Sequence, residues 1–301
     1  MSQIELMVTS DLPSALVTGL QQHFTVHHRE HIRDAAVLSR IHALVCPEGA
    51  AVGRDIMGLL PQLRMIAVMG ANTAGIDHTE AQRRAIVVVP TSDVTAQDVA
   101  DFALGLIIGL VRRIPMADQF VRAGDWVEGA YPVTQRLGSL RLGLLGLGDA
   151  GVALMRRARA CGMTVAYTAP QADADVPATH HARTLDLAQQ VDVLVVLSAE
   201  AVQHCGRIDA AVLEALGPQG YVVNLARGPV MDEEQVAQAL VAKQLAGVAS
   251  DGHPEAPRVS AALRQARPVI VTPAIGAWTQ QAVEQAVREL VANVNRFFSG
   301  Q

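Results

Sequence analysis

The chain has 301 residues, of which half are hydrophobic and 18% are charged, and this balance excludes disorder, collagen-like repeats and a disulfide scaffold. Its 24 basic and 29 acidic residues give a net charge of −5 without any basic block, so nucleic acid is not an expected partner. The three cysteines, Cys46, Cys161 and Cys205, form no CxxC pair, which favours a reducing compartment over a disulfide framework or a zinc site.

The N-terminal stretch contains Glu5 and Asp11 where a signal peptide would have a basic start and an apolar run. We therefore expect a cytoplasmic protein. The longest apolar run, residues 102–111, is roughly half as long as a membrane-spanning helix. We expect this run to form a buried helix, and we expect no membrane partner.

Short β-branched runs alternate with helical patterns along the whole chain, which is typical of parallel strands joined by right-handed crossovers. The first third of the chain is predicted to contain strands at residues 4–8, 43–46, 64–68 and 86–88. Helices are predicted between them, including residues 12–22 and 79–84. This part of the chain therefore predicts one doubly wound sheet.

A long helical segment at residues 95–112 follows, then a helix at 115–122 and an irregular stretch at 124–138. A second series of strands is predicted at residues 141–145, 164–167, 191–197, 221–224, 246–250 and 269–271. An amphipathic helix at residues 279–298 ends the chain. The two series together predict an α/β protein with two doubly wound parallel-sheet domains.

A glycine-rich turn lies between the first strand of the second series and the helix after it. It reads Gly146-Leu147-Gly148-Asp149-Ala150-Gly151, the GxGxxG pattern of dinucleotide-binding domains in its strand-turn-helix setting. The first glycine permits the tight turn, the second lets a diphosphate approach the backbone, and the third lets the helix pack on the strand. These six residues are predicted to bind NAD or NADP; the alternative is a glycine-rich turn without a ligand.

Two features bear on the identity of this cofactor. Asp149 places a carboxylate beside the expected diphosphate, where its charge is unfavourable unless it points to solvent. The next strand ends in Tyr167-Thr168-Ala169-Pro170, with Thr168 as the predicted ribose contact. The end of this strand lacks both the acidic residue that holds the ribose of NAD and an arginine for the 2′-phosphate of NADP. The choice between NAD and NADP stays open, and the absence of the acidic residue slightly favours NADP.

Seven stretches in order along the chain resemble the D-2-hydroxyacid dehydrogenase family, relatives of phosphoglycerate dehydrogenase and glyoxylate/hydroxypyruvate reductase. They are the glycine turn and MGANTAGID (69–77), QDVADFALGLIIGLVRRI (97–114), VRAGDW (121–126), NLARGPVMDEEQVAQAL (224–240), LAGVASDG (245–252) and VTPAIGAWT (271–279). The resemblance implies a flavodoxin-like substrate domain of residues 1–95 and 280–301 and a Rossmann-type cofactor domain of residues 96–279. It also implies a homodimer formed largely through the cofactor domains and their flanking long helices.

The resemblance also implies roles for single residues. Arg227 stands where the family has a catalytic arginine that binds the substrate carboxylate and orients the carbonyl, a task that suits a planar guanidinium; the alternative is a surface salt bridge. Asp251 matches an aspartate near the nicotinamide ring, unless it only caps a loop. Asn72 replaces a glycine in the loop whose backbone amides meet the carboxylate. Ala226 is a further predicted contact of the cofactor and Ala71 of the substrate. Trp278, next to the pocket in sequence, is predicted to form an apolar wall for the substrate; the alternative is plain packing.

The proton-transfer pair of the family is missing from this sequence. The family carries a histidine in TPHxG and a glutamate ahead of a proline, and these places hold Ala274 and Ala256. A slip of one residue would put Glu255 at the second place. General acid-base catalysis by a positioned side chain contributes roughly 10²- to 10⁴-fold, so the loss matters for the chemistry.

Three interpretations stay open. The first is a hydride-transfer enzyme with a displaced proton donor, for which His253 and His204 are the nearest candidates in sequence. The second is a hydride transfer that needs no enzyme proton, for example to an iminium. The third is a non-catalytic protein that binds a nucleotide or carboxylate and keeps only the fold. We favour an NAD(P)-dependent oxidoreductase that acts on a small carboxylate-bearing substrate.

Other patterns carry less information. Four histidines, at positions 23, 27, 28 and 31, lack the spacing of a metal site, so a solvated polar segment is predicted there and no metal is expected. GxSxG, HExxH and Walker lysine motifs are absent from the sequence, so hydrolase and ATPase chemistry has no support.

Overall fold

The computed structural model describes residues 4–9, 12–32, 34–91, 95–226 and 228–300. The chain divides into two compact units. Unit 1 consists of residues 1–94 and 278–301, and unit 2 consists of residues 95–277. The sequence placed the divisions at 95/96 and 279/280, whereas the structure has Thr95 in unit 2 and Trp278 and Thr279 in unit 1.

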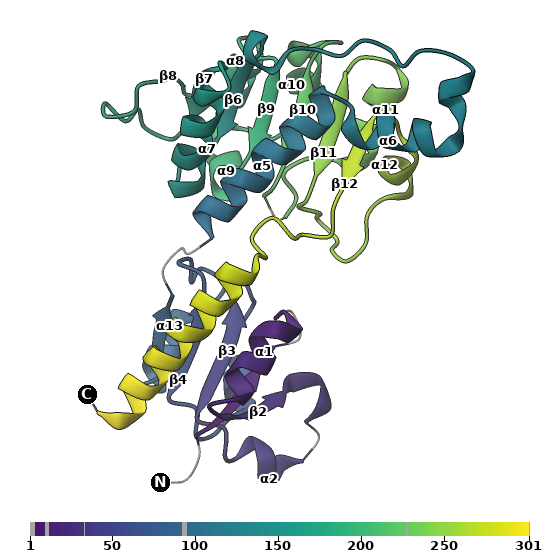
Figure 1. Cartoon of the computed structure of the whole chain (residues 1–301). Coiled ribbons are helices and arrows are strands. Elements are labelled where there is room, and N and C mark those ends of the chain that lie inside the picture. The colour runs from purple at the N-terminus through teal and green to yellow at the C-terminus, as the bar shows by residue number, and fades with distance from the viewer. Residues whose placement is uncertain (1–3, 10–11, 33, 92–94, 227, 301) are drawn as a thin grey trace. The chain divides into compact units, whose positions relative to one another are not determined.

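Unit 1 is built on a parallel five-stranded sheet with the strand order β2-β1-β3-β4-β5, of which Figure 1 labels β2, β3 and β4. Its strands are β1 (Glu5–Val8), β2 (Thr25–His28), β3 (Ala43–Pro47), β4 (Met65–Met69) and β5 (Val87–Pro90). The strand order changes direction between β1 and β3, so the carboxyl ends of these two strands form the switch point of the sheet, where doubly wound proteins bind ligands.

Helices cover both faces of this sheet. Leu6 and Val8 of β1 pack into one core with residues of α1 (Ser14–Gln21) and α13 (Gln280–Ser299), whereas Met7 packs into the opposite core. The opposite core also takes residues of α3 (Arg54–Leu59) and α4 (His78–Arg83), with the short α2 (Ala35–Leu38) beside it. The last helix of the chain therefore completes the core of the first unit, which explains its amphipathic sequence.

The histidine-rich segment differs from the prediction. Residues 25–28 form the edge strand β2, which pairs in parallel with β1, and its residues are half-buried rather than fully solvated. Nε2 of His27 lies 2.8 Å from Oε2 of Glu5 on the neighbouring strand. Over the described parts of the chain, no group of three His, Cys, Asp or Glu side chains is placed to hold a metal ion.

Unit 2 is built on a parallel seven-stranded sheet with the order β12-β11-β10-β9-β6-β7-β8. Its strands are β6 (Arg141–Leu145), β7 (Thr164–Thr168), β8 (Thr179–His181), β9 (Val193–Val196), β10 (Tyr221–Asn224), β11 (Gly247–Ser250) and β12 (Val269–Val271). The switch point lies between β6 and β9, as in Rossmann-type sheets. The α/β fold class with two parallel sheets is therefore confirmed.

Two layers of helices enclose the sheet of unit 2. One core contains residues of α5 (Ala96–Val111) and α7 (Asp149–Ala160). The other core contains residues of α8 (Thr184–Ala188), α9 (Ala199–Cys205), α10 (Ala210–Leu216), α11 (Glu233–Val241) and α12 (Ala261–Gln265). The apolar run 102–111 lies within α5 and packs on the sheet as predicted. In the part of the chain that the structure describes, no helix is long and apolar enough to cross a membrane.

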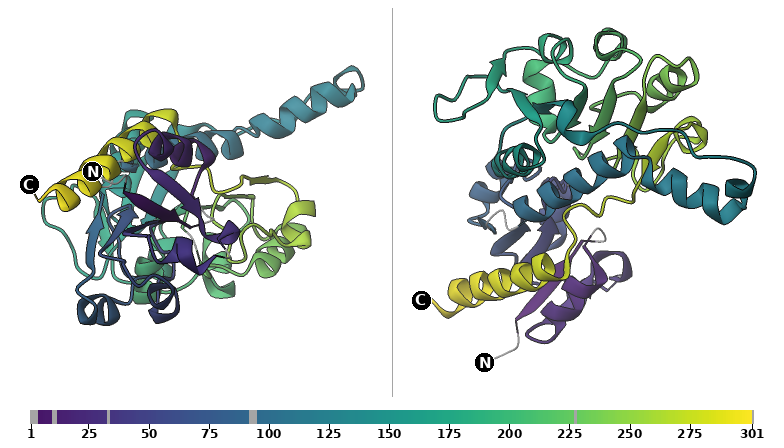
Figure 2. Two further views of the ribbon diagram at one scale, coloured as in Figure 1. Left: turned by 90° about the horizontal axis from the view of Figure 1, so that it is seen from below. Right: turned by 45° about the horizontal axis from the view of Figure 1, so that its top comes forward.

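Helix α6 (Ile114–Ala123) and the loop after it extend away from the sheet of unit 2 (Figure 2). None of the residues of α6 is buried. Beyond it, Trp126, Val127 and Val133 are 65%, 89% and 98% exposed. Isolated exposed apolar residues are common, whereas several on one projecting segment are a feature of interaction surfaces. We call α6 and residues 124–133 the arm.

Candidate active site

The glycine turn has the geometry that each of its glycines predicts. Gly146 has a φ of +99°, and a Cβ there would lie 2.8 Å from Cβ of Ser198. A Cβ on Gly151 would lie 2.9 Å from the carbonyl oxygen of Gly146, so only glycine permits this approach of α7 to the turn. By contrast, a Cβ on Gly148 would meet no atom within 4 Å.

The open space at Gly148 lies at the start of α7. Gly148 is the N-cap residue of this helix, and no side chain caps it. The first amides of a helix carry partial positive charge and attract phosphate groups. Asp149 is exposed, in agreement with the expectation that it points to solvent. The turn therefore fits the diphosphate of a dinucleotide: its backbone is accessible where a phosphate would approach.

The carboxyl end of β7 differs from the prediction in one respect. Thr168 is fully buried, and its hydroxyl has no partner among the described residues. The buried side chain of Thr168 therefore cannot contact a ribose in this conformation, and only the backbone of Thr168 could do so. Ala169 is the first partly exposed residue, and its carbonyl oxygen accepts a hydrogen bond of 2.8 Å from Nε2 of His180.

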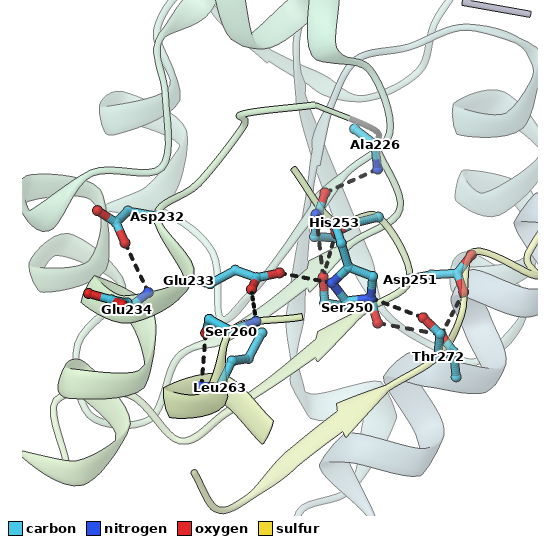
Figure 3. Close-up of polar contacts among 12 residues, drawn as sticks. Ala226, Asp232, Glu233, Glu234, Ser250, Asp251, His253, Ser260, Leu263 and Thr272 are labelled. Atoms are coloured by element: carbon cyan, nitrogen blue, oxygen red, sulfur yellow. Dashed lines mark hydrogen bonds and ion pairs between the residues drawn. The ribbon is translucent and has the colours of Figure 1, made fainter. Parts of the chain in front are cut away.

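Asp251, at the end of β11, fixes the loop after β12 (Figure 3). Its Oδ1 accepts hydrogen bonds from the hydroxyl of Thr272 at 2.6 Å and from the amide of Ile275 at 3.0 Å. Its Oδ2 accepts one from the amide of Gly276 at 2.8 Å. Asp251 is 5% exposed, and both oxygens of its carboxylate accept hydrogen bonds from this loop. The observed contacts are those of the loop-capping alternative; a contact with the nicotinamide stays a prediction.

A buried asparagine, which the sequence did not single out, positions the segment before Arg227. Asn224 donates from Nδ2 to the carbonyl oxygen of Gly252 at 2.7 Å, and its Oδ1 accepts from the amide of Ala226 at 3.0 Å. Ala226 is itself buried, which limits its contact with a cofactor to the backbone. Arg227 lies outside the described residues. The sequence signal that could have identified Asn224 is a polar residue at the end of an otherwise apolar strand.

A buried histidine and glutamate lie beside this loop (Figure 3). Nδ1 of His253 is 2.9 Å from Oε1 of Glu233, and its Nε2 is 3.0 Å from the carbonyl oxygen of Thr272. The other Glu233 oxygen accepts from the amide of Ser260 at 2.7 Å. The side chains are 3% and 6% exposed. Sequence analysis missed Glu233, because a glutamate in the first turn of a helix is normally a solvent-facing residue.

The loop after β4 in unit 1 contains the predicted substrate contacts Ala71 and Asn72, and both are exposed. The amide of Asn72 donates to Oε2 of Glu48 at 3.2 Å, and Oδ1 of Asn72 accepts from the amide of Ala74 at 2.8 Å. Glu48 was not predicted from the sequence. Trp278 is half-buried in unit 1, directly before Thr279, the N-cap of α13.

The sequence from α5 to the loop after β12 decides the family. Residues 104–276, more than half of the chain, match the family described as D-isomer specific 2-hydroxyacid dehydrogenase, NAD binding domain. The chain belongs to the D-isomer specific 2-hydroxyacid dehydrogenase family. The resemblance seen in the sequence is thereby confirmed, and the chain is assigned to a family of oxidoreductases.

Relatives match over nearly the full length. A glyoxylate/hydroxypyruvate reductase A of Arabidopsis thaliana is 30% identical over 100% of this chain and 98% of its own. The solved 2-hydroxyacid dehydrogenase of Ketogulonicigenium vulgare covers 100% of this chain and 97% of its own, with 29% identity and a TM-score of 0.90. An NADPH-dependent glyoxylate/hydroxypyruvate reductase of Sinorhizobium meliloti, solved with NADP and malonate, covers 99% and 94%, with 30% identity and a TM-score of 0.85.

The loop after β12, where the resemblance predicts a histidine and the sequence has Ala274, has an unusual backbone. Ala274 has a φ of 57°, in the left-handed region that a residue with a Cβ adopts at a cost of about 1–3 kcal/mol. The three Asp251 hydrogen bonds described above hold the loop in this form. Ala256 lies in an exposed loop, and the neighbouring Glu255 is exposed as well. Since residue 274 is an alanine, this loop supplies no imidazole at that position.

Of the two alternative histidines, His253 is not free to take the place of a histidine at position 274. Because the carbonyl oxygen of Thr272 can only accept, Nε2 of His253 must carry a proton, and its Nδ1 shares another with Glu233. Both nitrogens of His253 are therefore used inside the protein. His204 lies on the exposed surface of α9, and its Nδ1 is 2.9 Å from the carbonyl oxygen of Glu200. The displaced-donor interpretation gains no support from either residue.

Proposed function

We propose that this protein is an NAD(P)-dependent oxidoreductase that transfers a hydride to or from a small carboxylate-bearing substrate. The observation that carries the proposal is the glycine turn: Gly146 and Gly151 have conformations or contacts that require glycine, while Gly148 leaves open space at an uncapped helix start. Because this open position is at the first amides of a helix, it leaves room for a phosphate group there. The nucleotide supplies the hydride chemistry when it is bound.

The substrate class is supported by the relatives. The Sinorhizobium meliloti enzyme was solved with malonate, a small dicarboxylate, and the Arabidopsis thaliana relative is named for glyoxylate and hydroxypyruvate. In the proposed function, Arg227 binds a substrate carboxylate through its guanidinium and so orients the reacting carbon. Asn224 contributes by fixing Ala226, the residue before it.

The proposed chemistry does not use a histidine at the family position. Ala274 offers only a methyl group, and His253 is closed off by Glu233 and Thr272. We therefore propose a non-standard source of the proton, or a reaction that takes none from the protein. For the cofactor we propose NADP over NAD, because the end of β7 presents the neutral Ala169 and no carboxylate that would repel a 2′-phosphate.

Thermal unfolding with NAD, NADH, NADP and NADPH tests the cofactor site. A ligand at ~100 times its Kd stabilises the folded protein by about 2.7 kcal/mol, which is readily measured. Gly148→Ala should fold like the wild type, since its Cβ would meet no atom within 4 Å, yet its methyl group would obstruct the diphosphate and reduce the stabilisation.

Gly58→Ala is the matched control, because a Cβ at Gly58 of unit 1 also meets open space. It should keep the full nucleotide effect. If none of the four nucleotides stabilises the wild type, the oxidoreductase proposal is wrong and the non-catalytic alternative takes its place. Equal stabilisation of the wild type and Gly148→Ala would show that nucleotides bind elsewhere.

We also propose that the protein is a homodimer and that the arm takes part in the contact. The arm exposes Trp126, Val127 and Val133, a set of apolar side chains that a second copy would remove from water. Light scattering should give twice the monomer mass for the wild type. Val127→Asp should shift the equilibrium toward the monomer; an unchanged dimer would place the contact elsewhere.

A further inference from the structure

Polar residues at the carboxyl ends of β10, β11 and β12 form a connected set on one side of the switch point of unit 2. These strands are parallel neighbours, so their ends meet at one edge of the sheet. A Rossmann-type sheet consists of two mononucleotide-binding halves, and a dinucleotide lies across the switch point between them. In the proposed function the adenosine half therefore lies over β6, β7 and β8, and the nicotinamide half lies over β9 to β12.

Thr272, the residue directly after β12, is fixed through all of its polar groups. Its hydroxyl donates to Oδ1 of Asp251 at 2.6 Å, and its amide donates to the carbonyl oxygen of Ser250 at 3.0 Å. Its carbonyl oxygen accepts from Nε2 of His253 at 3.0 Å. The loop of residues 272–276 therefore starts from a fixed point, and one of the contacts that fix it comes from the buried His253.

Glu233 in turn fixes His253 (Figure 3). Its Oε1 lies 2.9 Å from Nδ1 of His253, and its Oε2 accepts from the amide of Ser260 at 2.7 Å. Glu233 is the first residue of α11, so these contacts connect this helix with the loop after β12. Apolar residues of similar volume often stabilise such a buried place equally well, but they could not donate to the carbonyl oxygen of Thr272. The pair is therefore suited to fixing the position of the loop.

The loop of residues 272–276 has a conformation that needs this support. Ala274 has a φ of 57°, and such a residue persists only where the surrounding structure determines its backbone. A Cβ on Gly276 would lie 3.0 Å from Oδ2 of Asp251, so the loop passes close to this carboxylate. Ile275 is 42% exposed although Asp251 holds its amide. The fixed loop thus presents an apolar side chain at the carboxyl edge of the sheet.

We propose that Glu233 and His253 are positioning residues for the nicotinamide half of the nucleotide. This inference rests on the proposed function. Through the carbonyl oxygen of Thr272 the pair fixes the loop of residues 272–276, and the exposed Ile275 of that loop packs against the nicotinamide ring. Neither Glu233 nor His253 touches the nucleotide or the reacting atoms. The adenosine half lies on the other side of the switch point, at the end of β7, and does not depend on the pair.

The test compares NADPH with 2′-phospho-ADP-ribose, which is the same nucleotide without the nicotinamide. Kd values are measured by titration calorimetry with the full chain, and NADH with ADP-ribose forms a second pair. Glu233→Ala removes the contacts with His253 and Ser260 together. It should raise the Kd of the reduced nucleotide about tenfold or more, because the nicotinamide ring loses a preorganised surface, and should change the Kd of the fragment by less than about twofold.

Two variants serve as controls. Glu233→Gln can keep both contacts, because its amide oxygen accepts from the Ser260 amide and its NH2 group donates to Nδ1 of a neutral imidazole, so it should bind like the wild type. Asp192→Asn removes a carboxylate directly before β9, at the opposite edge of the same sheet, where Asp192 accepts from Arg141 at 2.8 Å. This second control should lower stability without changing either Kd.

The fluorescence of the reduced nicotinamide reports on the ring itself. At saturating NADPH, the bound nucleotide should have lower nicotinamide anisotropy in Glu233→Ala than in the wild type. If Glu233→Ala fails to fold, His253→Leu combined with Glu233→Leu takes its place, since the double variant has no unpaired buried charge and still lacks the donor to the Thr272 carbonyl oxygen. It should show the same selective loss.

The outcomes separate the two proposals. An equal loss of affinity for the nucleotide and its fragment would show that the pair only stabilises unit 2. Unchanged Kd values and anisotropy would show that the nicotinamide half does not depend on the pair. Either result overturns this inference and leaves the proposed function intact. Failure of the wild type to bind any of these nucleotides overturns the proposed function and this inference with it.

Discussion

The pair formed by His253 and Glu233 should be one of the main determinants of the stability of unit 2. His253→Leu would leave the carbonyl oxygen of Thr272 without a donor and would leave the 6%-exposed Glu233 carboxylate with the Ser260 amide as its remaining contact. Loss of one partner of a buried ion pair costs about 3–5 kcal/mol, and an unpaired buried carbonyl alone costs about 1–3 kcal/mol. We expect His253→Leu to lower the free energy of unfolding by about 3–5 kcal/mol.

A double-mutant cycle separates the pair from the packing around it. His253→Leu combined with Glu233→Leu removes both ionisable groups, so the double variant should be at least 2 kcal/mol more stable than the sum of the single effects predicts, about the size of strong coupling between contacting residues. Urea unfolding followed by circular dichroism gives the three free energies.

A protein with two units need not unfold in one step. Hydrogen exchange of peptides spanning residues 250–276 therefore tests whether the lost stability belongs to unit 2. His204→Leu on exposed α9 is the control and should change stability by less than about 0.5 kcal/mol. A cost below about 1 kcal/mol for His253→Leu, or an additive cycle, would refute the argument that the two side chains form a stabilising pair in the interior of unit 2.

Two further predictions concern pH and reactivity. The guanidinium of Arg141 lowers the pKa of the Asp192 carboxyl by hydrogen bonding, so this pair stabilises the folded state above the ordinary aspartate pKa and loses its effect as pH falls through the lowered value. Asp192→Asn should therefore cost about 1 kcal/mol at pH 7, and its urea midpoint should approach that of the wild type as pH falls through the lowered Asp192 pKa; a difference that stays constant throughout acid titration would contradict it. Burial raises the pKa of the Cys46 thiol to about 12, so Ellman's reagent at pH 8 should leave Cys46 unmodified in the native protein while the partly exposed Cys161 reacts. Modification of Cys46 at the rate seen in urea would show that the unit 1 core opens.

Sequence patterns located the elements whose cause is local. Strands such as β3 and β10 were predicted because consecutive apolar residues mark a strand covered on both faces. The glycine turn was predicted because φ freedom and the absence of a Cβ are properties of the residue itself, and Gly146 and Gly151 use both. The two missed strands, β2 and β8, contain pairs of histidines and lie at sheet edges. Such strands depend on pairing with a neighbour, which their own residues do not reveal.

The sequence alone therefore determined the fold class, the family and the position of the glycine turn, because each rests on short local patterns that can be read along the chain. The tertiary structure decided how the polar groups are used. Glu48 reaches the Asn72 amide across 24 positions, Asp251 reaches Gly276 across 25, and His253 reaches Glu233 across 20. These contacts arise because parallel strands bring their carboxyl ends to one edge of a sheet, so residues on different crossovers meet there.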